Sequence, residues 1–133
     1  MKLGLKFSPE NLTRDNLRFA QQMGVTHIVV HSPRSNASGV LDFLELLRMR
    51  KFVESFDLQL FACENLTTAH WRAIALAAEE REAGIRNACI SIENMGKVGI
   101  PILGYYFSLS GVSGHWRAYE SGGGRGGAGL KSF

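Results

Sequence analysis

The sequence predicts an α/β protein, and specifically the N-terminal part of a (β/α)₈ TIM barrel with four strand–helix units in one domain over residues 1–133. Short apolar runs alternate with segments of helical periodicity, and the connections between them are short, which is typical of a parallel sheet with right-handed crossovers. After the fourth strand comes a glycine-rich stretch in place of a further helix. This ending favours an unfinished barrel over the alternative, a small doubly wound parallel sheet, because a complete doubly wound domain would cover that face with another helix.

The first unit combines an alternating strand with a well-capped helix. Residues 3–7 alternate between apolar and other positions with period two, and Ser8 and Pro9 end the strand. Thr13 is a favourable N-cap, and Gly24 suits the position just after a helix. We expect the helix to bury one face formed by Leu17, Ala20 and Met23.

The second unit begins with a β-branched run at residues 27–30, which predicts a parallel strand covered on both faces. A polar loop follows at residues 31–36, and Ser38 is the expected N-cap of the next helix. The buried face of that helix is predicted from apolar residues at spacings of three and four: Phe43, Leu46, Met49, Val53 and Phe56.

The third unit has a strand at residues 58–63 that ends on Glu64 and Asn65. Helical composition resumes at residues 67–78, and we expect two helices with a joint near Gly84, because glycine inside a helix costs about 1 kcal/mol relative to alanine. The second of these helices should end at the glycines 96 and 99. Its predicted apolar face consists of Ile85, Cys89, Ile92 and Met95.

The fourth strand is expected at residues 100–107, with Pro101 tolerated because it stands at the start. Residues 108–133 are rich in glycine and lack apolar periodicity, so we assign them to a loop.

Composition and charge give no indication of a nucleic-acid-binding protein or a membrane protein. The chain is 45% hydrophobic with a net charge of +3 and a pI of about 9.1, and its basic residues are scattered, so no nucleic-acid partner is expected. No apolar run approaches the roughly 20 residues of a membrane span, and no membrane association is expected. We expect Cys63 and Cys89 to be buried free thiols; together with the missing secretory signal they predict a cytoplasmic protein.

In a parallel α/β fold the ligand site lies at the carboxyl ends of the strands. These positions carry Ser8, His31, Glu64 with Asn65, and residues 106–108. His31 could orient a hydroxyl group or exchange a proton near neutral pH. Glu64 directly follows an apolar strand and could serve as a base, a ligand or a binder of sugar hydroxyls.

The glycine-rich stretch holds the remaining candidates. Arg117 offers a planar fork that matches a carboxylate, and Trp116 can stack on the apolar face of a sugar; alternatively Trp116 fills the barrel mouth and Arg117 pairs with Glu120. Residues 122–127 could cradle an anion with the charge of Arg125, or could form a flexible lid or linker.

Four segments of the chain resemble the mannonate dehydratase family. They are residues 85–107, the strand end at 29–33, the run Cys63-Glu64-Asn65 and the loop with Trp116-Arg117. The resemblance implies a xylose-isomerase-like barrel that converts D-mannonate to 2-dehydro-3-deoxy-D-gluconate in hexuronate (glucuronate) catabolism, with Mn²⁺ or a similar divalent metal.

The resemblance also implies where the chemistry resides. The metal would hold the carboxylate while the α-proton is abstracted and a hydroxyl departs. The family's His, Cys and Asp ligands come from later strands, and neither cysteine here matches them, so we expect no metal ligands in this chain and leave the catalytic residues unassigned. The expected substrate-binding residues are His31, Glu64, Trp116, Arg117 and Arg125.

Two further expectations follow from reading the chain as part of such a barrel, and two alternatives to its function remain. The fragment alone should be inactive, and its open sheet edges favour association into a homo-oligomer. A sugar isomerase or epimerase on the same barrel remains an alternative. So does a small α/β module that binds an anion or RNA, which the basic pI and the Gly-Arg segment motivate.

Overall fold

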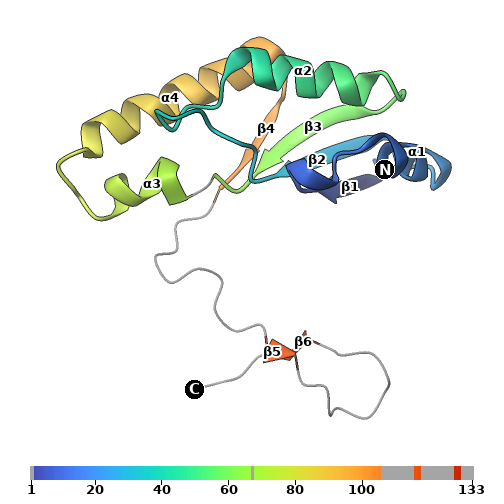
Figure 1. Cartoon of the computed structure of the whole chain (residues 1–133), viewed down its shortest axis with the longest axis horizontal. Coiled ribbons are helices and arrows are strands. Elements are labelled where there is room, and N and C mark those ends of the chain that lie inside the picture. Colours follow the sequence, from blue (N-terminus) through green and yellow to red (C-terminus); the bar gives the residue numbers. More distant parts are fainter. Residues whose placement is uncertain (1, 67, 106–115, 118–127, 130–133) are drawn as a thin grey trace.

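The computed structural model describes residues 2–66, 68–105, 116–117 and 128–129. Four strands in these ranges form one parallel sheet in the order β1-β2-β3-β4 (Figure 1). Their bounds are Gly4–Phe7 for β1, His27–His31 for β2, Gln59–Glu64 for β3 and Ile102–Gly104 for β4.

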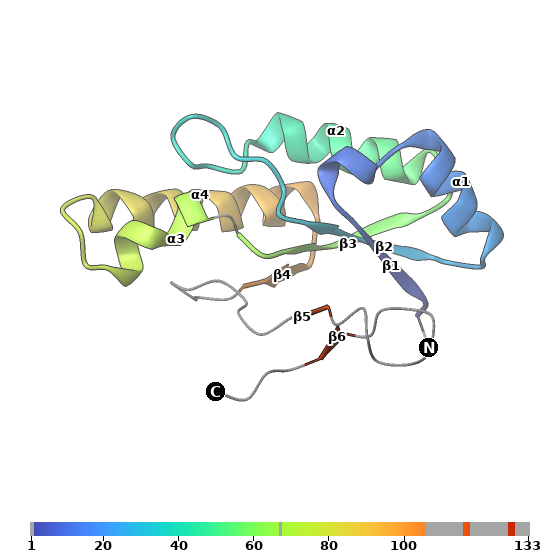
Figure 2. The same ribbon diagram turned by 60° about the horizontal axis from the view of Figure 1, so that its bottom comes forward.

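The strand order decides between the two architectures. A doubly wound sheet reverses its strand order at a switch point, whereas each strand here lies beside its predecessor without a reversal. Successive right-handed crossovers in one direction bring the helices to the same face. Figure 2 shows α1 (Arg14–Gln22), α2 (Phe43–Glu54) and α4 (Arg81–Val98) on one side of the strands. The sheet is therefore wound as in a barrel, as predicted.

The first unit follows the sequence prediction except at its end. The Thr13 hydroxyl accepts a hydrogen bond from the Asn16 N–H at 3.3 Å, and Leu17 is fully buried. Gly24 follows the helix with φ of 75°, in the left-handed region. Met23 was expected on the buried face but is 61% exposed, because it is the residue at which the helix ends. A short 3₁₀ helix, η1 (Pro9–Asn11), precedes Thr13 and was not predicted.

Helix α2 begins at Phe43, and its N-cap is Asp42, four residues after the expected cap Ser38. The Asp42 carboxylate accepts hydrogen bonds from the N–H groups of Leu44 and Glu45. Ser38 instead lies in a turn whose backbone is held by the side-chain oxygen of Asn36. The predicted apolar face of the helix is confirmed. Two of its residues are buried and three pack partly buried against the core: Leu46 and Val53, then Phe43, Met49 and Phe56.

The joint between the third-unit helices lies before Gly84, not at it. Helix α3 spans Thr68–Ala75, and Gly84 lies inside α4. A Cβ atom at position 84 would stand 3.1 Å from Cγ1 of Ile74. The close approach of α3 to α4 therefore accounts for a glycine within the helix.

The buried face of α4 also differs from the prediction. Its buried residues are Ser91, Met95 and Val98, whereas Cys89 and Ile92 are exposed. A serine on the inner face breaks the apolar pattern from which the face was inferred. The helix ends at Gly99, which adopts φ of 80°, while Gly96 lies within it.

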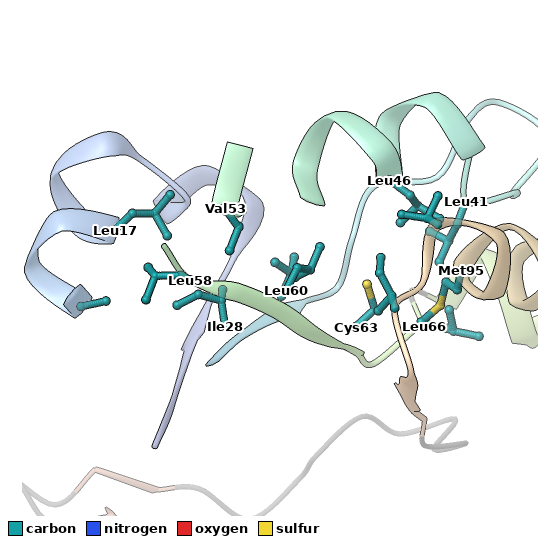
Figure 3. Packing of buried hydrophobic residues seen from close by; sticks show 14 of the residues in the cluster. Leu17, Ile28, Leu41, Leu46, Val53, Leu58, Leu60, Cys63, Leu66 and Met95 are labelled. Atoms are coloured by element: carbon teal, nitrogen blue, oxygen red, sulfur yellow. The ribbon is translucent and has the colours of Figure 1, made fainter. Parts of the chain in front are cut away.

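The core fills the space between the sheet and these helices (Figure 3). Ile28, Leu60 and Cys63 contribute from the strands, and Leu17 and Val53 from the helices. Both cysteines are free, but only Cys63 is buried, so the expectation of a buried Cys89 was wrong. Burial raises the pKa of the Cys63 thiol to about 12, because the thiolate would lose its hydration.

Strands β4, β5 (Trp116–Arg117) and β6 (Ala128–Gly129) lie in the C-terminal part of the chain. Strand β4 is shorter than the predicted 100–107: it begins after Pro101, which cannot donate to the ladder, and Tyr105 already lies outside it, while residues 106–107 are not among the described residues. Within the predicted loop, β5 pairs antiparallel with β6, so these four residues are not loop. Among the described residues, no helix is long and apolar enough to cross a membrane.

Candidate functional site

The polar strand ends meet on the face of the sheet that points away from the helices. Partner residues in a parallel sheet share a face, and successive residues alternate between faces. The partners Val30 and Cys63 are fully buried on the helix side, whereas the next pair, His31 and Glu64, lies on the opposite side. We call this second side the open face; in a closed barrel it would be the interior.

An irregularity in β3 brings Glu64 opposite His31. The register passes from Ile28–Leu60 to Val29–Ala62, so β3 has one residue more than β2 at this point. Without the extra residue, Cys63 would lie opposite His31 and Glu64 would turn toward the helices. A bulge near a site often re-aims a side chain in this way.

The open face at this edge holds a compact polar cluster. Oε2 of Glu64 lies 3.4 Å from Nζ of Lys6 and 3.9 Å from Nδ1 of His31. The three side chains are between one-third and just over one-half exposed. The cluster is therefore accessible to a ligand, and its ion pair is partly screened by water.

Asn65 fixes the orientation of His31. The side-chain amide of Asn65 lies with Nδ2 at 3.3 Å from Nδ1 of His31, and an amide nitrogen can only donate. Asn65 itself adopts φ of 61°, and its backbone N–H donates to the Gly104 carbonyl at 2.9 Å.

Two further contacts hold the strand ends around Glu64. The Ser32 N–H donates to the Glu64 carbonyl at 2.6 Å, which ties the end of β2 to β3. On the other side, a Cβ atom at Gly104 would stand 3.3 Å from Cγ of Glu64. Gly104 therefore leaves the room in which the Glu64 side chain lies.

The structure brings together some of the predicted site residues and not others. His31 and Glu64 are neighbours, whereas the Ser8 hydroxyl accepts a hydrogen bond from Asn11 in η1. The backbone of Trp116 and Arg117 forms β5, and their side chains, like all of Arg125 and residues 106–108, lie outside the described part of the chain.

Sequence reasoning missed Lys6 and Gly104. The signal for Lys6 was present, since it stands between Leu5 and Phe7 in an alternating strand and must face the other side. Its neighbours on that side could not be named without the strand order and the bulge.

The described residues do not form a complete metal site. No group of three His, Cys, Asp or Glu side chains is gathered within them, and the cluster supplies two such donors, His31 and Glu64. Catalytic metal sites commonly use three protein ligands. No reaction step through a metal is therefore assigned to these residues.

A singly wound α/β sheet with polar side chains at the carboxyl ends of its strands is the arrangement of barrel enzymes. Residues 1–118 match the family model described as D-mannonate dehydratase (UxuA), and the chain belongs to this family of hydro-lyases of carbohydrate metabolism. The resemblance noted in the sequence is thereby confirmed.

A solved structure supports the fold. The chain is similar to the mannonate dehydratase from Streptococcus suis serotype 2, with a TM-score of 0.64 and 23% identity over 79% of this chain. The match covers 30% of the length of that structure, and at this identity it shows the fold alone. No curated protein matches the chain.

Proposed function

We propose that the chain forms part of the substrate pocket of a metal-dependent mannonate dehydratase, which converts D-mannonate to 2-dehydro-3-deoxy-D-gluconate. The observation that carries this proposal is the pairing of His31 with Glu64 on the open face, at the carboxyl ends of adjacent strands. Family membership supports the same reaction. The two free cysteines support a cytoplasmic location.

The reaction needs groups of the kind found in the cluster. Water leaves when the proton next to the carboxylate is removed and a neighbouring hydroxyl departs, and the resulting enol becomes the 2-keto product. A carboxylate such as Glu64 can accept a proton or a hydroxyl hydrogen bond, and a ring N–H of His31 can donate to a sugar hydroxyl. We therefore assign both residues to binding of the sugar hydroxyls.

Three residues of the C-terminal stretch complete the proposed pocket. Arg117 would bind the carboxylate with its guanidinium fork, and Trp116 would stack on the carbon chain of the ligand. Arg125 would add positive charge. The family match runs to residue 118, so Trp116 and Arg117 lie within the matched region and Arg125 lies beyond it.

Mn²⁺ is the proposed metal, held by residues outside the described cluster. Its chemistry would be to bind the carboxylate and stabilise the negative charge that develops when the α-proton leaves. The described residues on their own are expected to show no turnover, because they hold no set of three donors.

Turnover of D-mannonate tests the proposal. Purified protein that contains this chain, supplied with Mn²⁺, should form the 2-keto acid. Glu64→Gln should lower kcat/KM by roughly 10- to 100-fold, because a neutral amide is a weaker acceptor than a carboxylate for the hydrogen bond of a sugar hydroxyl. Glu54→Gln is the matched control, since Glu54 lies on α2 in an ion pair with Arg50, and it should leave kcat/KM unchanged.

Two results would contradict the proposal. Formation of a ketose or epimer without loss of water would favour a sugar isomerase or epimerase on the same barrel. Equal activity of the Glu64→Gln variant and the unmodified protein would remove Glu64 from the site.

A further inference from the structure

Lys6 is the cationic side chain of the cluster. It lies on β1, pairs with Val29 in the sheet and reaches from the open face to Glu64, with 3.4 Å between Nζ and Oε2. Its side chain is 54% exposed, so packing does not explain its presence. Arg34, which follows β2 in the sequence, is instead paired with Glu10 at 3.2 Å.

The charge of Lys6 changes what the cluster can bind. The carboxylate of Glu64 would present a negative charge, which repels the carboxylate of a ligand. The ammonium group of Lys6 cancels this charge. It carries three hydrogen-bond donors, and contact with one oxygen of Glu64 leaves donors for a ligand.

We propose that Lys6 is a specificity-determining residue, whose ammonium group binds the carboxylate of a sugar acid while His31 and Glu64 contact its hydroxyls. This inference rests on the proposed function, because it names a residue of the described sheet that favours an acid over a neutral sugar at the same site. An ammonium beside a carboxylate recognises both parts of such a ligand: the anion at Lys6 and a hydroxyl donor at Glu64.

The test compares an acid with a neutral ligand of the same carbon skeleton. Calorimetric titration of D-mannonate and D-mannitol into protein that contains this chain, with Mn²⁺ left out so that mannonate is not converted, should show tighter binding of mannonate. Lys6→Gln should weaken mannonate binding by about tenfold or more, the loss expected for a charge-assisted hydrogen bond, and should leave mannitol binding unchanged. Lys6→Arg should restore most of the preference for the acid, because it keeps the positive charge.

A matched control exists on the outer surface. Lys51 pairs with Glu54 on α2 at 3.0 Å, and Lys51→Gln removes the same kind of ion pair far along the chain from the cluster. This variant should bind both ligands as the unmodified protein does. Circular dichroism confirms that each variant is folded, and Lys6→Met is a second neutral variant should Lys6→Gln not fold.

Three results would overturn the inference. An equal loss of affinity for both ligands in Lys6→Gln would mean that Lys6 only positions Glu64. An unchanged affinity for mannonate would mean that Lys6 has no role in binding. Unmodified protein that prefers neither ligand would leave no specificity for Lys6 to provide. Failure of the proposed function is distinguishable, because mannonate would then bind through Lys6 without being converted to the 2-keto acid.

Discussion

At the scale of single residues, the space around Glu64 depends on Gly104. A Cβ atom there would lie 3.3 Å from Cγ of Glu64, closer than most such contacts, and 3.5 Å from its Cα, an ordinary contact distance. The backbone of the two residues is also linked, since they are partners in the register of β3 and β4. A methyl group at position 104 must therefore displace the Glu64 side chain from its neighbours Lys6 and His31.

The substitution Gly104→Ala should lower the affinity for D-mannonate by several-fold, with little change in thermal stability. The side chain of Glu64 is partly exposed and can move by a few tenths of an ångström without disturbing the core. The free energy of unfolding should therefore fall by no more than about 1 kcal/mol. Titration calorimetry and a thermal melt measure the two quantities.

Gly96→Ala is the control for this prediction. Gly96 lies inside α4, where an added Cβ atom meets nothing within 4 Å. Alanine should stabilise the helix by up to about 1 kcal/mol and leave ligand affinity unaltered. An unchanged affinity in Gly104→Ala would show that the position of Glu64 does not depend on this glycine.

At the scale of elements, α4 holds the segment before α2 through a row of polar side chains. The Ser91 hydroxyl accepts from the Leu41 N–H at 3.0 Å and donates to the Asn87 carbonyl at 2.8 Å. One turn further along, Asn94 donates to the Leu41 carbonyl at 2.9 Å. Both backbone groups of the fully buried Leu41 are therefore satisfied by a helix about 50 residues later in the chain.

Ser91→Ala should destabilise the fold by about 1–3 kcal/mol, because the Leu41 N–H would be buried without an acceptor. The free energy of unfolding from urea denaturation measures the loss. Asn87→Ala, which removes a hydrogen bond at an exposed position on the same helix, should cost less. A cost for Ser91→Ala no larger than that for Asn87→Ala would mean that water reaches Leu41 or that the loop shifts.

The same row of side chains explains which helix predictions succeeded. The start of α1 was predicted correctly because Thr13 caps it through a local bond to Asn16. The start of α2 was not, because the sequence offers two caps, Ser38 and Asp42, and the bonds from α4 hold residues 38–41 outside the helix. The inner face of α4 was misplaced for a related reason, since a polar residue, Ser91, faces the core.

The candidate site was predictable to the extent that it depends on strand ends. His31 and Glu64 were found because each follows an apolar run, and parallel strands bring their carboxyl ends to one edge. That they share a face follows from the extra residue in β3, which no pattern in the sequence located. Lys6 needed the same information, because its contact with Glu64 crosses β2, the strand between them.

At the scale of the whole molecule, periodicity predicted strand–helix units but could not by itself separate the two ways of winding them. The observed order β1-β2-β3-β4 did so, since it places the described helices on one face and leaves the other to the polar cluster. Cys63 marks this division: its thiol lies in the core, and the adjacent Glu64 faces the opposite side.

The free energy of unfolding should fall at alkaline pH because of Cys63. Its pKa is raised from 9.0 to about 12 by burial, so the folded state keeps the thiol protonated at pH values where the unfolded chain ionises it. The stabilising preference for the protonated form is complete below pH 9 and is lost as the pH rises from about 9 toward 12. The slope from this one group approaches about 1.4 kcal/mol per pH unit.

Urea denaturation measures this pH dependence of the free energy of unfolding. The measurements should cover several pH values from about 8 to about 11, the range in which the thiol of the unfolded chain ionises. Other groups also titrate there, so the informative quantity is the difference from Cys63→Val, an apolar variant of similar size that lacks the ionisable group. Cys89→Ser is the control at the exposed cysteine and should retain the full slope. Identical slopes in Cys63→Val and the unmodified chain would show that the thiolate of Cys63 is tolerated in the fold, and therefore that the core around it admits water.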